Sequence, residues 1–151
     1  MANSVSSTEL NSWLEGVLRP FGPAERRTMF REIVADLYRS QSSRIQAQQN
    51  PDGTHFEARR PRRGNKTIRE RAMFSRLRNR KNLKSTSDAN HAAVGFTGRT
   101  ARIAEIHQGG LLAEVEPGGP LVRYARRELL GFTREDLSRI ESTIASRLAG
   151  R

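Results

Sequence analysis

The first fifty residues carry two stretches with the apolar spacing of amphipathic helices. The first stripe predicts a helix capped by Ser7 and ended by the turn at 20–23. Pro23 then suits the first turn of a second helix, predicted over about 24–48. The stripes are Leu10, Trp13, Leu14, Val17 and Leu18 in the first helix, and Phe30, Ile33, Val34, Leu37, Gln41 and Ile45 in the second. Trp13 and Phe30 are expected to anchor the core.

The second half of the chain alternates short extended segments with helices. The predicted elements are strands at 83–87 and 91–96 joined by a turn at 88–90, a helix at 99–108, and an extended pair at 111–116 and 121–124. A last helix follows Thr133, an expected N-cap, with Glu135 and Asp136 in its first turn. Its apolar stripe is Leu137, Ile140, Ile144 and Leu148, and Gly150 ends it.

Segregated helices and strands predict an α+β fold, with a small antiparallel sheet covered by the N-terminal and C-terminal helices. The 151 residues are expected to form one domain, 1–151. Within it we expect a helical part at 1–50, a basic arm with a short helix at 51–82, and a third part at 83–151 that holds the hairpin, a helix and the C-terminal helix.

The charge of the chain is concentrated in one segment. The formal net charge is +11. Residues 1–55 are neutral and residues 85–151 carry +1, whereas residues 56–84 carry nine Arg and three Lys against two acids, a net charge of +10. The excess therefore belongs to one surface or arm and not to the fold as a whole.

We call residues 56–84, which carry this charge, the basic arm. Its expected contact residues are Arg59, Arg60, Arg62, Arg63, Lys66, Arg69, Arg71, Arg76, Arg78 and Arg80. Residues 59–66 contain Pro and Gly without periodicity and predict a loop. Met73 and Leu77 stand at i and i+4, which predicts a short basic helix over 68–80.

The charge of the basic arm is typical of a surface that binds nucleic acid, of one that binds an acidic protein, or of a solvated loop. Only Phe56 and Phe74 accompany the charge, which is thin for the stacking surfaces of single-strand binders. A helix-turn-helix is a competing interpretation because the turn at 20–23 has the right length. The second helix, however, is long and carries three acids against five arginines, and most of the excess charge lies elsewhere.

Several functional classes are excluded or disfavoured. No window approaches 18 uncharged apolar residues, the start has no secretory-signal pattern, and there is no cysteine, so we expect a soluble intracellular product with no membrane segment. The histidines, at 55, 91 and 107, lack metal spacing, and no phosphate-binding glycine loop or nucleophile elbow occurs. We therefore expect no enzyme, cofactor or metal. His55 is expected in a turn, His91 exposed at a strand start, and His107 in contact with a helix C-terminal dipole.

Two passages resemble a known family. One is Gln46-Ala47-Gln48-Gln49-Asn50-Pro51-Asp52-Gly53-Thr54-His55-Phe56, and the other runs from His107-Gln108-Gly109-Gly110 through Tyr124 to Leu129-Leu130-Gly131-Phe132-Thr133-Arg134-Glu135-Asp136. In order and spacing they resemble the tail completion protein S family, the phage virion morphogenesis proteins of contractile-tailed bacteriophages. The motif residues are Pro51, Asp52, Gly53, His107, Gln108, Tyr124, Leu129, Leu130, Gly131 and Asp136.

The resemblance implies a structural virion protein that completes the tail and allows head–tail joining. It implies a self-assembled ring, often a hexamer, at the neck of the tail, put together in the host cytoplasm. Expected partners are tail tube or sheath proteins, the head–tail connector and, as a lesser possibility, genomic DNA in the channel. The alternative from the residues alone is a small nucleic-acid-binding module that uses the arginine-rich segment 59–84.

Overall fold

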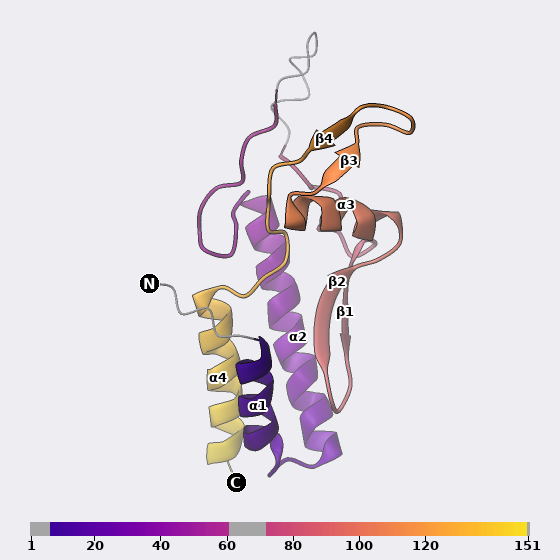
Figure 1. Ribbon diagram of the computed structural model, residues 1–151. Helices are drawn as coiled ribbons and strands as arrows, with labels where there is room; N and C mark the ends of the chain where they lie inside the picture. The colour runs from indigo at the N-terminus through magenta and orange to yellow at the C-terminus, as the bar shows by residue number, and fades with distance from the viewer. Residues whose placement is uncertain (1–6, 61–71, 151) are drawn as a thin grey trace.

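The described residues form four helices and two antiparallel hairpins (Figure 1). The computed structural model describes residues 7–60 and 72–150. In chain order the elements are α1 (Ser7–Leu18), α2 (Pro23–Gln46), β1 (Leu83–Ser87), β2 (Ala92–Phe96), α3 (Arg99–Gly109), β3 (Leu112–Glu114), β4 (Leu121–Arg123) and α4 (Arg134–Ala149). The predicted α+β class is confirmed.

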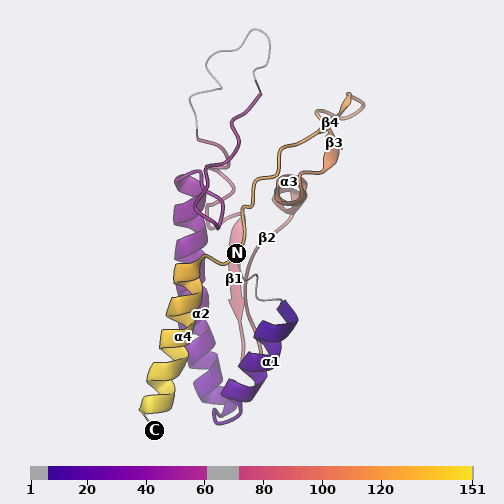
Figure 2. The same cartoon turned by 60° about the vertical axis from the view of Figure 1, so that its left-hand side comes forward.

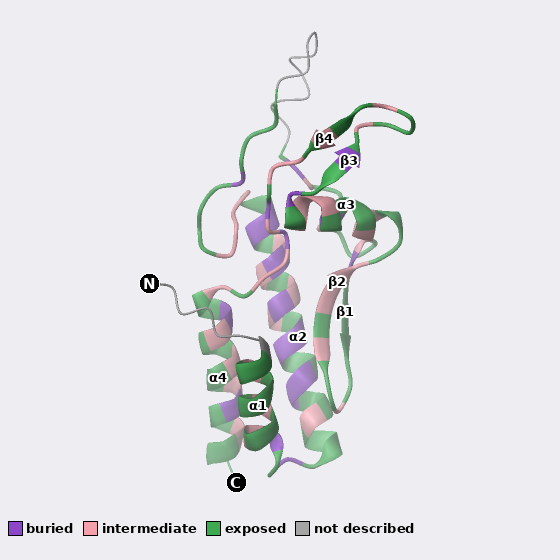
Figure 3. Ribbon diagram, viewed as in Figure 1, coloured by how far each residue is buried: buried purple, intermediate pink, exposed green. Residues whose placement is uncertain are grey.

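Helix α2 is the central element of the structure. The β1–β2 hairpin packs on one side of it and α4 on another (Figure 1). Pro23 opens α2 as predicted, and the Glu25 carboxylate accepts a hydrogen bond from the Gly22 backbone N–H at 2.9 Å. All six positions of the predicted α2 stripe are buried, together with Met29 and Arg44 (Figure 3).

The apolar core is divided into two clusters, one at each end of α2. The first joins α1, α2 and α4, and partly buried residues of β2 pack against it. Its buried members are Leu18, Phe21, Met29, Phe30, Ile33, Leu37 and Ile144. The second surrounds the C-terminal end of α2 and contains Ile45, Phe56, Met73, Ala104 and Leu129.

Both predicted hairpins are present as two separate two-stranded sheets. In the first, Leu83 pairs with Phe96 and Ser87 with Ala92. In the second, Leu112 pairs with Arg123. The β3–β4 hairpin projects away from the helices (Figure 2). No helix among the described residues is long and apolar enough to cross a membrane.

Two sequence predictions about local structure were wrong. Residues 72–82 form turns and not a helix, because Phe74 has a positive φ of 63° and the chain reverses there. Residues 68–71 of that prediction lie outside the described residues. Trp13 is 44% exposed and is not a core anchor, because α1 packs on the first cluster through Leu14, Val17 and Leu18. Phe30 is buried as expected. The Ser7 cap falls on a side chain outside the described part.

The N-terminus of α4 is held by a reciprocal capping box. The Asp136 backbone N–H donates to Thr133 Oγ1 at 3.0 Å, and the Thr133 N–H donates to Asp136 Oδ2 at 2.9 Å. The predicted cap is thus confirmed, and it satisfies two backbone N–H groups near the helix N-terminus.

Thr133→Ala removes the acceptor of this capping box. We expect it to lower the free energy of unfolding by about 1 kcal/mol, measured by urea titration. Ser138→Ala, an exposed change inside the same helix, is the matched control and should leave stability within about 0.5 kcal/mol. Equal losses in the two variants would contradict the role given to the cap.

Candidate functional site

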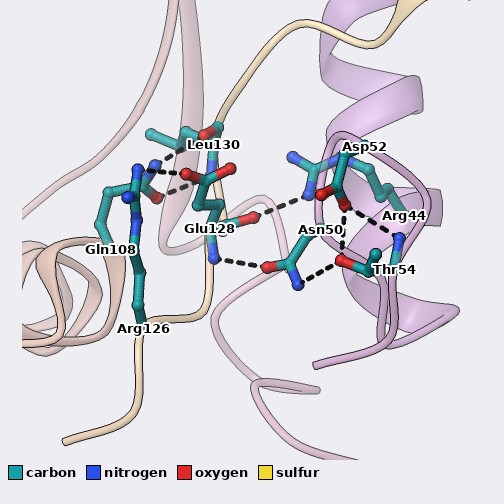
Figure 4. Close-up of polar contacts among 8 residues, drawn as sticks. All are labelled: Arg44, Asn50, Asp52, Thr54, Gln108, Arg126, Glu128 and Leu130. Carbon is teal, nitrogen blue, oxygen red and sulfur yellow. Dashed lines mark hydrogen bonds and ion pairs between the residues drawn. The ribbon is translucent and has the colours of Figure 1, made fainter. Parts of the chain in front are cut away.

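The motif residues predicted from sequence converge at the C-terminal end of α2. There the chain from residue 127 to 131, which we call the clamped segment, runs beside α2, α3 and the turn at 50–54 and bends at residues 129 and 130 (Figure 4). Its peptide groups are hydrogen-bonded mainly by side chains, because the segment belongs to neither hairpin. The contacts that hold it form the side-chain clamp described below.

The turn at 50–54 supplies one of the contacts that form the clamp. Asp52 Oδ1 accepts hydrogen bonds from the Thr54 backbone N–H at 2.9 Å and from its hydroxyl at 2.5 Å, and these bonds lower the pKa of Asp52. Asn50 Nδ2 donates to Thr54 Oγ1 at 3.1 Å. The Asn50 Oδ1 atom is then free to accept the Glu128 backbone N–H at 2.9 Å.

Two glutamine side chains form with the clamped segment the pairs of backbone hydrogen bonds that a neighbouring strand would form. Gln41 donates to the Gly131 carbonyl at 2.8 Å and accepts the Gly131 N–H at 3.1 Å. Gln108 donates to the Leu130 carbonyl at 2.7 Å and accepts the Leu130 N–H at 3.0 Å. Each amide therefore satisfies both polar groups of one residue.

Arg44 supplies the largest share of donors to the clamp. Its Nη1 donates to the carbonyls of Gln49 at 2.9 Å and Glu128 at 2.8 Å, and its Nη2 donates to the Leu129 carbonyl at 2.9 Å and to Gln41 Oε1 at 2.6 Å. Burial lowers the pKa of Arg44, while the charges of Asp136 and Glu128 act in the opposite direction. The buried charge is compensated by four acceptors, as such a group requires.

Arg127 and Gln48 tie the basic arm to this region. The Arg127 side chain donates to the carbonyls of Glu57 at 2.7 Å and Ala58 at 3.1 Å, where the arm begins. Gln48 exchanges two hydrogen bonds of 2.8 Å with the backbone of Met73, where the described chain resumes. The described residues of the arm that precede position 61 and follow position 71 are therefore fixed near the end of α2.

Gly131 and Pro51 bring the two family passages into direct contact. A Cβ added to Gly131 would lie 2.5 Å from Pro51 Cγ, closer than side chains approach in real structures. Only glycine therefore fits against this proline without displacement. Gly53 is favoured in the turn at 50–54 for a different reason: its φ is +87°, a backbone conformation that glycine adopts without strain.

His107 lies in an aromatic and cationic environment. Its ring makes edge contacts with Phe74 and Tyr124, with centroid separations of 4.8 and 5.1 Å. Arg127 Nη1 is 3.2 Å from His107 Nδ1, and burial with the Arg127 and Arg59 charges lowers the pKa of His107 to about 4. Because guanidinium only donates, Nδ1 is the acceptor and the imidazole is neutral at pH 7. His107 lies in the last turn of α3, as predicted, and as a neutral imidazole it interacts with the helix dipole less strongly than the charged form would.

The other motif residues and histidines are placed as follows. Leu129 is fully buried in the second cluster, and Asp136 is buried in the α4 capping box. His55 is exposed in the turn, and His91 is exposed next to β2, 2.8 Å from an Asp88 oxygen. Among the described residues, no group of three acidic or histidine side chains is positioned to hold a metal ion.

The structure divides the predicted contact residues of the basic arm. Arg59 and Arg60 are exposed at the end of residues 7–60, and Arg76, Arg78 and Arg80 lie in the turns that follow Met73. Arg62, Arg63, Lys66, Arg69 and Arg71 lie outside the described residues. Sequence reasoning missed Arg44 and Asn50, which hold the clamped segment, and Gln48 and Arg127, which hold the basic arm. A polar residue within an apolar stripe, as at Gln41, was the one available signal for such a contact.

Gly131→Ala tests the contact between the two passages. We expect a loss of about 1–3 kcal/mol in the free energy of unfolding, because the new methyl group must displace Pro51. A double-mutant cycle with Pro51→Ala should recover part of that loss. The same cost in both backgrounds would show that the close approach is not what requires glycine.

His107 predicts a pH dependence of stability. The unfolded chain takes up a proton near the ordinary pKa of 6.5, whereas the folded imidazole stays neutral down to about 4. Stability from this group is therefore fully present above pH 6.5 and is lost as the pH falls toward 4. The urea midpoint of His107→Gln should change less between pH 7 and 4.5 than that of the native chain. His55→Gln is the control, and an unchanged pH dependence in His107→Gln would contradict the assignment.

Comparison with known proteins agrees with the resemblance seen in the motifs. The model of the phage virion morphogenesis family matches residues 5–149. The tail completion protein S of Escherichia phage P2 is 36% identical over 138 residues, which cover 89% of this chain and 92% of that protein. No solved structure was found to match. The family predicted from two short passages is confirmed over nearly the whole sequence, and the chain belongs to the phage virion morphogenesis family.

Proposed function

We propose that this protein completes the tail of a contractile-tailed phage or phage-tail-like particle. In this role the chain, 1–151, acts as a single non-enzymatic domain. Copies of it form a ring, a hexamer, at the neck, where the ring ends tail growth and allows the head to join. The observation that carries the proposal is the collinear match to 92% of a phage tail completion protein, with the motif residues Gln108, Leu130 and Gly131 hydrogen-bonded in the clamp.

Exposed apolar side chains support assembly into a ring. Leu112 and Leu121 of the β3–β4 hairpin are 55% and 67% exposed, and Trp13 of α1 is 44% exposed. The hairpin and α1 lie toward opposite ends of the molecule (Figures 1 and 2). A ring needs two different patches on each subunit, one for each neighbour, and two separated apolar regions meet that need.

We assign the remaining contacts to other virion components. Tail tube or sheath proteins and the head–tail connector are the proposed protein neighbours of the ring. The basic arm, including Arg59, Arg60, Arg76, Arg78 and Arg80, is the proposed surface for an anionic partner. The protein is thereby a component of the virion at the tail neck, assembled in the host cytoplasm.

Leu121→Ser tests the ring. Native mass spectrometry of the purified chain should give a hexamer, and Leu121→Ser should shift it toward smaller species because the hairpin loses its most exposed apolar side chain. Ile103→Ser, at a residue 43% exposed on α3, is the matched control and should leave the hexamer intact.

The position in the particle is tested separately. Antibody labelling of purified particles that encode the protein should mark the head-proximal end of the tail. Labelling at the baseplate, or absence of the protein from the particles, would contradict the proposed role, as would a native chain that stays monomeric both alone and on isolated tails.

A further inference from the structure

The described part of the basic arm continues directly into strand β1. We call residues 76–87 the basic turn. Its cations are Arg76, Arg78, Arg80, Lys81 and Lys84, and all except the half-buried Arg78 are exposed. The sequence contains no Asp or Glu from Ala72 to Ser87. The basic turn therefore has five positive charges and no internal carboxylate to neutralise them.

These cations also lack carboxylate partners elsewhere in the described chain. The arginine–carboxylate ion pairs lie on other surfaces: Arg39 with Asp36, Arg126 with Glu128, Arg139 with Glu135, and Arg147 with Glu32. Two acids of the neighbouring helix α2, Glu32 and Asp36, are thus engaged with other arginines. Within residues 7–60 and 72–150 the charge of the basic turn is therefore uncompensated, and an external anion would neutralise it.

The basic turn is fixed in position before any partner binds. The Tyr38 hydroxyl donates to the Arg78 carbonyl at 3.4 Å, and Arg80 lies over the Tyr38 ring at 5.9 Å from its centroid. Asn82 Nδ2 donates to the Arg76 carbonyl at 2.9 Å, which closes the turn on itself. Because the backbone is held against α2, little ordering entropy is lost when the charges meet a ligand.

The side chains beside the charges are small hydrogen-bonding groups. After Lys84, strand β1 exposes Ser85, Thr86 and Ser87. Hydroxyl groups next to Arg and Lys are the usual donors to phosphate oxygens in protein–DNA contacts. The strand thus extends the charged surface with groups suited to the same ligand.

The surface lacks the apolar anchors typical of a protein partner. The large exposed apolar residues are Trp13, Ile103, Leu111, Leu112, Leu121, Phe132 and Leu148, and none lies in the basic turn. Protein interfaces are centred on buried aromatic or aliphatic anchors, whereas phosphate backbones are bound by charge and hydrogen bonds. Phe74, the aromatic residue nearest to the turn in sequence, packs against the second core cluster and leaves no stacking surface for single strands.

We propose that the basic turn binds the phosphate backbone of double-stranded DNA without sequence preference. The inference deepens the anion-facing part of the proposed function, and its test does not depend on ring formation. Binding of this kind is electrostatic, so its affinity falls steeply with salt as counterions return to the DNA.

The test measures binding of the full chain to a random-sequence DNA duplex by fluorescence anisotropy at several salt concentrations. The variant Arg76→Ser/Arg80→Ser/Lys81→Ser/Lys84→Ser removes four exposed cations and leaves Arg78, which contacts Ser42. Each lost phosphate contact reduces the slope of log K against log salt by about 0.9, so the slope should become shallower by about 3 to 4. The melting temperature establishes that the variant is folded.

The matched control removes four exposed arginines from other surfaces, as Arg19→Ser/Arg27→Ser/Arg31→Ser/Arg134→Ser. It changes the net charge by the same amount and should change the slope by less than about one. An unchanged slope in the basic-turn variant, or an equal change in the control, would overturn the proposal. So would tighter binding of polyglutamate than of the duplex at equal charge concentration, which would identify an acidic protein as the partner.

Repeating the measurement in Leu121→Ser separates this proposal from the ring. Duplex binding that persists in the dissociated chain supports the basic turn whatever the oligomeric state. A hexamer that fails to bind the duplex overturns the DNA contact alone. A native chain that binds the duplex but stays monomeric both alone and on isolated tails contradicts the ring and leaves the DNA contact standing.

Discussion

The structure depends on the side-chain hydrogen bonds that pair the backbone N–H and C=O groups of one segment that has no strand partner. Peptide groups removed from water must be hydrogen-bonded, and residues 127–131 belong to neither sheet. Gln41, Arg44, Asn50 and Gln108 supply the missing donors and acceptors from three different parts of the chain. These side chains make the backbone hydrogen bonds that a neighbouring β-strand makes in an ordinary sheet. The path of the chain from the β3–β4 hairpin to α4 is set by these contacts.

The same clamp explains why two passages distant in sequence carry the family resemblance. The turn after α2 places Pro51 against Gly131 and Asn50 against Glu128, and α3 places Gln108 against Leu130. Each of these residues meets the shape or the hydrogen-bonding groups of its partner. The motif therefore identifies the scaffold, while the exposed charges and leucines lie on other surfaces.

Local signals in the sequence predicted the elements well, and long-range contacts could not be predicted from it. Helix α4 was predicted because Thr133 and Asp136 form a cap within four residues. The pairings of Arg44 with Leu129 and of Gln48 with Met73 span 85 and 25 residues, and no periodicity encodes them. The error at 72–80 has a specific cause, since Met73 and Leu77 show helical spacing but the positive φ at Phe74 breaks the helix.

The two ties at the base of the basic arm have a consequence for how the family can change. Arg127 fixes the backbone at residues 57 and 58, and Gln48 fixes it at Met73, so the intervening stretch begins and ends at anchored points. The side-chain hydrogen bonds of the clamp come from Gln41, Arg44, Asn50 and Gln108 in the described part of the chain, and none of these residues lies between the two anchors. A change of length or charge between residues 58 and 73 therefore leaves the partners of the clamp in place.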